Sequence, residues 1–364
     1  MQLGFLRPLF AGTANYASIY LDASSKADDS SEAVALRWRA ARQRLADAGA
    51  DAATLAALKQ AVTGPVRPAP GLAAFAREGH VVFIAPLPGP PQREISRYAR
   101  LPHLMPLLAQ YPPHVPQLRV RADRSGGEVI AARTPEDVTK ERVDGGGWPV
   151  HKTSLGGWSQ MRYQRSAEEA WEENAKRLAA AVTTAAEQTR AALIVIGGDV
   201  KARSLLLDHL GSALRERAVI VDKEVSADSD LMARAADNAA QALTDEDCRR
   251  RLEDFRAGSA RALTAQGLAE TLSALRDGRA SEVFIVDDPS STASSWIGPR
   301  PADVAASEAE LRERGVSEIV QDRADAAIVR AVAATDAELR FVPAGEQPPR
   351  HGIGALLRYP TPAG

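Results

Sequence analysis

The chain has 364 residues, enough for two or three domains, and its 45% hydrophobic and 25% charged residues are typical of a folded globular protein. No apolar run approaches the roughly 20 residues of a membrane helix, and Arg7 and Pro8 interrupt the start before a signal peptide could form. The single cysteine, Cys248, excludes an intrachain disulfide and a multi-cysteine zinc site. A net charge of −2 gives no global basic field, so any RNA contact would need a local patch. These features predict a soluble cytoplasmic protein.

Residues 1–115 predict an N-terminal α/β domain. Apolar spacing and turn residues indicate the following elements in chain order: a strand at Ala17–Leu21, helices at Ser31–Leu45 and Asp51–Val62, strands at Leu72–Phe75 and His80–Ala85, and a short helix at Leu104–Ala109. The turn Arg77-Glu78-Gly79 joins the last two strands as a hairpin. The proline cluster between Pro112 and Pro116 marks the first domain boundary.

Residues 116–222 predict a second, central domain. Strands at Leu118–Ala122 and Glu128–Ala131 flank a glycine turn, and a glycine-rich loop follows at Asp144–Pro149. Ser166 and Glu169 have the spacing of a capping box, so a long helix is expected to begin there. A buried strand at Ala191–Ile196, a tight turn at Gly197-Gly198 and an N-cap at Asp199 come next. This order predicts a mixed sheet with helices against it.

Residues 223–364 predict a third domain. The expected helices are Asp228–Leu243, Asp245–Phe255, Thr264–Leu275 and Ala324–Ala334, and the expected strands are Glu282–Val286, Leu339–Val342 and the closing Gly352–Tyr359 segment. Their alternation predicts a small α/β/α sandwich. The whole chain is therefore expected to belong to the α/β class with three domains.

The most unusual segment runs from His151 to Arg165, where glycines, a glutamine and basic residues lead directly into the long helix. Between Lys140 and Arg165 there are five basic residues (Lys140, Arg142, Lys152, Arg162 and Arg165) and two acidic ones (Glu141 and Asp144), a local balance of 5 − 2 = +3. A glycine loop flanked by cations suits a phosphate backbone. On these residues alone, a surface loop with solvated charges is the simpler interpretation.

Familiar catalytic patterns fail. Met161 stands where a nucleophile elbow around Ser159 would need its last glycine, and no Walker loop or complete dinucleotide fingerprint is present. Other candidates have simpler explanations. Asp287-Asp288 suits a turn better than a metal site, and Asp123 lacks the carboxylate partners of a metal site. Cys248 lies in a charged helix and is interpreted as incidental, and His80, His103 and His151 lack ligand spacing, so a satisfied or exposed histidine is the expectation. The arginines Arg249-Arg250-Arg251 and Arg256 alternate with carboxylates, which indicates a salt-bridged helix face. No metal ion or cofactor is expected.

Three motifs in order resemble one known family. The segment Gly156-Gly-Trp-Ser-Gln-Met-Arg-Tyr-Gln-Arg165 resembles the central-domain loop of eukaryotic and archaeal class-I release factors, where a Gly-Gly-Gln tip precedes an Arg-Phe-x-Arg-like turn and a long helix. Gln266–Ala269 looks like the start of a third-domain helix of that family, and Gly352–Tyr359 is similar to its closing strand. The resemblance covers about the last two-thirds of the chain. It implies a bacterial member of the class-I release factor and Pelota superfamily.

The resemblance also implies folds and partners. The N-terminal domain would lie on the decoding side, the central domain would be ribonuclease-H-like, and the third domain would be similar to the ribosomal L7Ae/L30e proteins. The implied partner is the 70S ribosome, with its 23S and 16S rRNA, at the A site. Elongation factor Tu and P-site tRNA are candidates for further partners, a membrane is not, and A-site entry requires a monomer.

Two departures from the family pattern shape the functional hypotheses. The Asn-Ile-Lys-Ser segment used in reading stop codons is missing, so codon-specific termination is not expected. Trp158 and Ser159 separate Gly157 from Gln160, a spacing similar to that of Vms-type peptidyl-tRNA hydrolases. The three-domain layout also resembles Balon-like ribosome hibernation factors, which occupy the A site.

The resemblance assigns roles to particular residues. In the hibernation hypothesis the loop fills the peptidyl transferase centre, with RNA contacts from Lys152, Gly156, Trp158, Arg162 and Arg165. In the hydrolase hypothesis Gly157 lets the backbone approach the ester and Gln160 positions water. We prefer occupancy, because the bulky Trp158 is an unusual residue in a loop that must admit water. A non-ribosomal α/β scaffold is the third alternative.

Overall fold

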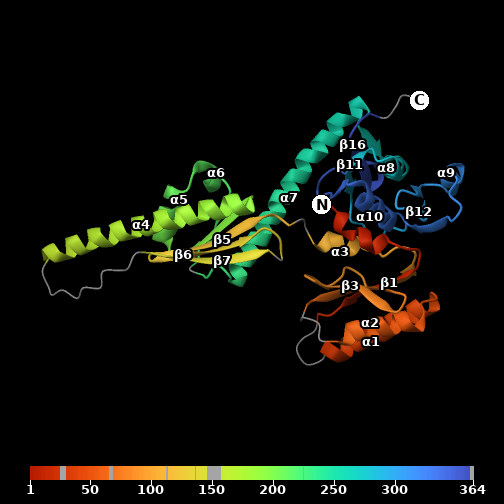
Figure 1. Cartoon of the computed structure of the whole chain (residues 1–364), viewed down its shortest axis with the longest axis horizontal. Helices are drawn as coiled ribbons and strands as arrows, with labels where there is room; N and C mark the ends of the chain where they lie inside the picture. Colours follow the sequence, from red (N-terminus) through yellow and green to blue (C-terminus); the bar gives the residue numbers. More distant parts are fainter. Residues whose placement is uncertain are drawn as a thin grey trace. The chain divides into compact units, whose positions relative to one another are not determined.

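A computed structural model of the chain describes residues 1–24, 30–64, 69–111, 114–135, 137–145, 157–223 and 225–360. The chain divides into two compact units, one formed by residues 1–112 and 247–364 and the other by residues 113–246 (Figure 1). Helices and strands occur in both units, which confirms the α/β class. The predicted division into three domains at residues 115/116 and 222/223 stays a prediction.

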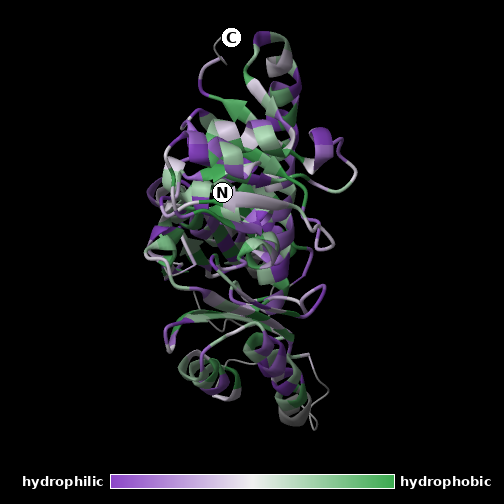
Figure 2. Cartoon of the chain, turned by 90° about the vertical axis from the view of Figure 1, so that its right-hand side faces the viewer, coloured by the Kyte–Doolittle hydropathy of each residue, from purple (hydrophilic) through white to green (hydrophobic). Residues whose placement is uncertain are grey.

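The N-terminal part of the first unit is an antiparallel sheet in the order β3-β2-β1-β4. Its strands are β1 (Tyr16–Asp22), β2 (Gly71–Arg77), β3 (His80–Leu87) and β4 (Ile95–Ala99). Helices α1 (Ser30–Asp47) and α2 (Ala52–Thr63) cover one face, where Trp38 and Leu58 pack on Ile19. Hydrophobic and hydrophilic residues alternate along both helices at the lower end of Figure 2, as expected for helices with one face on a sheet.

The C-terminal part of the same unit is a sheet in the order β10-β16-β11-β15. Its strands are β10 (Thr264–Gln266), β11 (Ala280–Ile285), β15 (Glu338–Phe341) and β16 (Ile353–Leu357). Successive β11 side chains alternate between its faces. Val283 and Ile285 join the core with α8 (Gly267–Arg276) and α10 (Ala324–Thr335), whereas Phe284 packs on Leu252 and Phe255 of α7 (Asp230–Gly258). This is the predicted α/β/α sandwich.

Further elements complete the first unit. They are the 3-10 helices η1 (Gly4–Phe10), η2 (Ser259–Arg261) and η3 (Arg350–Gly352), helices α3 (Met105–Gln110) and α9 (Glu308–Glu313), and a small sheet of β12 (Ser294–Ile297), β13 (Val304–Ala305) and β14 (Val320–Arg323). A single core cluster joins the N-terminal and C-terminal parts of the unit, because Tyr20 and Phe75 belong to the same cluster as Val283 and Leu339.

The second unit is one five-stranded sheet in the order β7-β6-β5-β8-β9. Its strands are β5 (Gln117–Asp123), β6 (Gly126–Ala132), β7 (Val138–Asp144), β8 (Leu193–Gly198) and β9 (Ala218–Ile220), and its helices are α4 (Gly157–Thr189), α5 (Val200–His209), α6 (Ser212–Arg215) and the first part of α7. β5, β6 and β7 pair antiparallel, whereas β5, β8 and β9 pair parallel. This order fits the ribonuclease-H-like fold that was expected.

Three predicted element boundaries are wrong. The long helix α4 begins at Gly157 instead of Ser166, so Ser166 lies inside it and is not a cap. The two helices expected on either side of Thr244 are one continuous α7, in which the Thr244 hydroxyl donates to Ala240 O. Thr264–Gln266 is a strand, and α8 begins only at Gly267. The strands β4, β7, β9, β12, β13 and β14 were not predicted.

Within the described ranges, none of the helices is both long enough and apolar enough to cross a bilayer.

Candidate functional site

Five of the seven residues predicted to form the site lie at the start of α4. Lys152 and Gly156 lie outside the described residues. Gly157, Trp158, Gln160, Arg162 and Arg165 belong to the first turns of α4, where the backbone is helical and the side chains are not described. Their proposed side-chain contacts therefore stay predictions.

The helical backbone at this position has a chemical consequence. The first four N–H groups of an α-helix have no acceptor within the helix, and here they belong to the turn that begins at Gly157. The aligned peptide dipoles add partial positive charge at the same end. Backbone at this end of α4 can therefore donate hydrogen bonds to a phosphate or to another oxygen anion.

A cation–aromatic cluster fixes α4 to the sheet behind the site. The guanidinium carbon of Arg124 lies 4.7 Å from the ring centre of Trp171 in α4, and Lys201 Nζ lies 4.8 Å from it. Such contacts contribute about 0.5–1 kcal/mol each at exposed sites. Lys201 also lies 3.4 Å from the Glu168 carboxylate, a second link to α4. The cluster thus anchors the helix at two positions one turn apart.

Asp199 organises the residues of this cluster. Its carboxylate caps α5 by accepting from the N–H groups of Lys201 and Ala202 at 3.0 Å each, and it lies 3.1 Å from Arg124 Nη2. Burial would raise the pKa of the Asp199 carboxyl, but the hydrogen bonds from the Ala202 N–H and Arg124 outweigh it and lower that pKa. Asp199 is therefore an ionised partner that orients Arg124 under Trp171, and its predicted capping role is confirmed.

The segment that leaves β7 toward the predicted loop is also fixed. The N–H of Gly145 donates to Ser125 O at 2.6 Å, and Asn174 Nδ2 in α4 donates to Arg124 O at 2.9 Å. A Cβ atom at Gly145 would lie 2.3 Å from Asn174 Oδ1, so the chain passes directly against α4 here. The buried Asn174 amide therefore positions the segment at the start of the loop, and Asn174 belongs to α4, the helix that follows the loop in the sequence.

Replacing Asn174 with alanine is expected to destabilise the second unit by about 1–3 kcal/mol, because Asn174 is buried and its removal leaves Arg124 O without this donor. Hydrogen exchange at Gly145 and Ser125 should accelerate more than exchange in β8. Lys176→Ala is the matched control, because it changes an exposed residue two positions along the same helix. It should leave the stability of the unit and the hydrogen exchange at Gly145 and Ser125 unchanged. Equal protection of Gly145 in the Asn174→Ala protein would contradict this positioning role.

Two of the five cations counted in the sequence are already paired. Lys140 Nζ lies 2.8 Å from Glu128 and 3.0 Å from Asp228, and Arg142 Nε lies 2.9 Å from Asp144. The basic character expected of the loop therefore depends on Lys152, Arg162 and Arg165.

The remaining sequence candidates have structural roles. The Asp123 and Asp288 carboxylates accept hydrogen bonds from serines two residues on and form turns. The arginines of the predicted salt-bridged face do pair with carboxylates: Arg249 and Arg256 with Glu346, Arg250 with Asp247, and Arg251 with Asp254. Within the described part of the chain, no group of three or more histidine, cysteine or acidic residues could hold a metal ion.

Arg124, Trp171 and Lys201 were missed as site residues. They come from the β5–β6 turn, from α4 and from α5, so no local spacing in the sequence joins them. The available signal was the position of Lys201 two residues after the predicted cap Asp199, in the first turn of a helix that follows a buried strand.

The chain is similar to several known proteins. Residues 116–261 match the family model of bacterial archaeo-eukaryotic release factor family 2. The uncharacterized proteins MT2704 and Rv2629 of Mycobacterium tuberculosis are each 29% identical over 367 residues, covering 97% of this chain and 96% of the relative.

Among solved structures, Pelota of Archaeoglobus fulgidus is 14% identical, with a TM-score of 0.37 over 80% of this chain and 86% of that one. Ribosome-bound archaeal Pelota, in a structure with ABCE1, is 12% identical, with a TM-score of 0.40 over 99% and 95%. Both TM-scores are below 0.5, so only the family match bears on function.

Proposed function

Since the chain is a bacterial archaeo-eukaryotic release factor-type protein, we propose that it binds the A site of the bacterial ribosome and acts on idle or stalled ribosomes during stress or hibernation. The observation that carries the proposal is the family match over residues 116–261, which spans the predicted loop, α4 and the anchoring cluster. The family resemblance inferred from Gly156–Arg165 is thereby confirmed, and the ribosomal role is our proposal. Its natural setting is the cytoplasm.

The geometry of α4 supports this role. Among the side chains of α4 that the structure describes, which begin at Ala167, the first buried ones are Asn174, Ala175 and Leu178. The preceding turns from Gly157 to Ala170 would span about 20 Å at 1.5 Å per residue. Figure 1 shows this end of α4 projecting past the sheet of its own unit. A projecting helix that is anchored at Trp171 and Asn174 suits a protein that places a loop into a narrow site.

In this proposal the loop occupies the peptidyl transferase centre without chemistry. Trp158 stacks on an exposed base, a contact of about 1–3 kcal/mol, and Arg162 and Arg165 bind rRNA phosphates. Lys152 and Gly156, which precede these residues in the sequence, are proposed to make further RNA contacts. Elongation factor Tu and P-site tRNA are further proposed partners. Gln160 is dispensable for occupancy, which separates this proposal from hydrolysis.

Peptidyl-tRNA hydrolysis is the second candidate, favoured by the spacing Gly157-x-x-Gln160. Gln160 would position water at the ester carbonyl, and Gly157 would allow close approach of the backbone. The free N–H groups of the first turn of α4 would stabilise the developing oxyanion. Such a site needs no general base from the protein, which agrees with the absence of a catalytic triad from the sequence.

A single-turnover release assay separates the two candidates. Ribosomes carrying labelled peptidyl-tRNA in the P site are mixed with wild type or with Gln160→Ala, and ribosome pelleting is measured in parallel. We expect both proteins to pellet with ribosomes and neither to release peptide. Loss of one oxyanion or water-positioning group costs roughly a hundredfold or more in rate, so a hydrolase would be evident from a wild-type burst that Gln160→Ala abolishes.

A second variant tests occupancy itself. The triple substitution of Trp158, Arg162 and Arg165 by alanine should weaken pelleting by at least about tenfold, because it removes one stacking and two phosphate contacts. Lys176→Ala is the control on the same helix. Unchanged pelleting of the triple variant would refute insertion of the loop, and failure of wild type to pellet would favour a non-ribosomal scaffold.

A further inference from the structure

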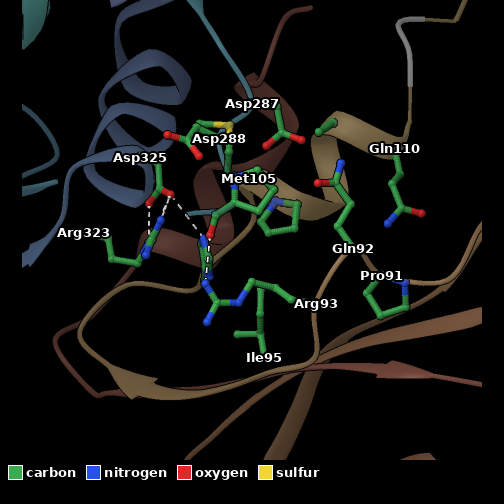
Figure 3. A pocket seen from close by; sticks show the side chains of 14 residues that line it. Pro91, Gln92, Arg93, Ile95, Met105, Gln110, Asp287, Asp288, Arg323 and Asp325 are labelled. Atoms are coloured by element: carbon green, nitrogen blue, oxygen red, sulfur yellow. Dashed lines mark hydrogen bonds and ion pairs between the residues drawn. The ribbon is translucent and has the colours of Figure 1, made fainter. Parts of the chain in front are cut away.

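The first unit contains a pocket that the proposed ribosomal role does not use. It has about 520 Å³ of empty space, a volume that includes the open solvent at its mouth. Figure 3 shows Asp287, Met105 and Gln92 around this space. The pocket lies at the carboxyl end of β11, beside the first residues of α10, and α3 together with the segment before β4 forms the opposite wall.

Two buried polar atoms on the pocket wall have no hydrogen-bond partner among the described residues. They are Nδ1 of His103 and Oε1 of Gln110. The His103 side chain is only 7% exposed, and its Nε2 lies 3.3 Å from Asp325 Oδ2. An ionised Asp325 accepts from Nε2–H, and in the neutral imidazole this leaves Nδ1 as an acceptor. Both unsatisfied atoms are therefore acceptors, and each is costly to bury without a donor.

The charges around the pocket are unevenly paired. Arg323 Nε lies 3.0 and 3.1 Å from the two oxygens of Asp325. Burial would raise the pKa of the Asp325 carboxyl, but hydrogen bonds from His103 and Arg323 outweigh it and hold that pKa well below its usual range. The Arg93 guanidinium donates to Pro289 O. Asp325 and Arg323 thus neutralise one another.

Asp287 is the carboxyl that lacks a cation. It is half-buried, and among the described residues no hydrogen bond or ion pair reaches it. Burial raises the pKa of the Asp287 carboxyl, the charges of Asp325 and Asp288 raise it further, and the opposing effect of His103 is smaller, so the pKa is raised in sum. A cation bound beside Asp287 would favour the ionised carboxylate and so offset both its burial and the repulsion from Asp325 and Asp288.

We propose that this pocket binds an organic cation with several N–H donors on a short aliphatic chain, such as an alkylguanidinium. The cation pairs with Asp287, and its other N–H groups donate to His103 Nδ1 and Gln110 Oε1. The apolar wall suits the aliphatic chain and consists of Pro91, Ile95, Met105, Pro106 and Ala109. This site does not depend on ribosome binding.

Calorimetric titration of the full-length protein with propylguanidinium tests the proposal. We expect saturable binding that Asp287→Asn weakens at least about tenfold, because the substitution removes the negative charge that strengthens the hydrogen bonds to the cation. Asp288→Asn is the matched control: its exposed side chain forms the turn with Ser290, which asparagine also forms, so binding should change less than about twofold. Gln110→Leu removes one acceptor and should also weaken binding. This second variant tests the proposal even if Asp287→Asn impairs folding.

Further ligands show which chemical features the pocket recognises. Tetramethylammonium carries the charge without N–H donors, so equal binding of it would overturn the proposal. Propionate would bind in place of the cation if Arg93 and Arg323 governed the pocket, and this too would overturn it, as would no binding of propylguanidinium. Agmatine and a blocked Gly-Arg-Gly peptide then show whether the guanidinium comes from a free small molecule or from an arginine side chain of a peptide. Only an open site admits the peptide.

Discussion

Replacing Asp322 with alanine is expected to destabilise the first unit strongly, and more than the replacement of an exposed carboxylate such as Asp254. The Asp322 side chain is 1% exposed, accepts from Leu101 N–H at 3.0 Å and pairs with Arg97 of β4. Asp322 lies in β14, so these bonds tie the C-terminal part of the unit to its N-terminal sheet. Removal leaves the buried Leu101 N–H without this acceptor, and the mostly buried Arg97 guanidinium loses its carboxylate partner and keeps only the Leu101 carbonyl oxygen as an acceptor among the described residues.

The expected cost is about 3 kcal/mol, the lower end for breaking a buried ion pair, because Arg97 retains some contact with water. For a unit of this size that corresponds to a fall in Tm of about 6–12 °C, measured by calorimetry. Asp254→Ala is the matched control, since Asp254 forms an exposed pair with Arg251 and should shift Tm by no more than about 2 °C. Equal Tm values for the two variants would show that the Asp322 contacts contribute nothing.

Apolar periodicity was enough to predict the elements that carry each core. The runs Leu118–Ala122 and Ala191–Ile196 are the adjacent parallel strands β5 and β8, and the helix of Ala324–Ala334 is α10, whose residues are mostly buried. In contrast, β7 (Val138–Asp144) is a sheet-edge strand with mainly exposed polar side chains, so no alternation revealed it. Strand β14 carries Gln321 and Asp322 and depends on long-range partners in the same way.

The error at the start of α4 has an identifiable cause. Ser166 and Glu169 satisfy the spacing of a capping box, but an N-cap also requires a non-helical residue at that point, and the chain is already helical from Gly157. Spacing alone does not report the conformation of the preceding residues. For the site this matters, because it places Gln160 in the first turn of a helix and not in the loop before it.

The pocket at Asp287 could not be predicted, because its residues come from separate segments. His103 was interpreted as a satisfied or exposed histidine and Asp287 as part of a turn. The structure confirms the turn for Asp288 and brings His103, Gln110 and Asp287 together through the shared core of the first unit. The sequence shows which functional group each residue has, but only the tertiary fold brings these groups together.

Gly198→Ala should be the most damaging small substitution in the second unit. Gly198 ends β8 at φ +107°, and a Cβ atom there would lie 2.1 Å from Ala122 O and 2.9 Å from Ala122 N in β5. Strain at such a φ costs about 1–3 kcal/mol, and overpacking against rigid backbone adds a similar amount. The combined cost is expected to be about 3 kcal/mol or more.

The damage should reach the candidate site because Asp199 follows directly. The Asp199 N–H donates to Ala122 O at 2.9 Å, the same oxygen that an alanine at position 198 would displace. Movement of Asp199 would disturb the cap of α5, its ion pair with Arg124 and thus the support of Trp171. We therefore expect Gly198→Ala to raise hydrogen exchange in β5, β8 and the anchored part of α4 together. Gly211→Ala is the control: it has open space around its Cβ position and an ordinary φ of −58°, and should cost under about 1 kcal/mol. If both variants exchanged like wild type, the close approach of Gly198 to Ala122 would not be a constraint on the site.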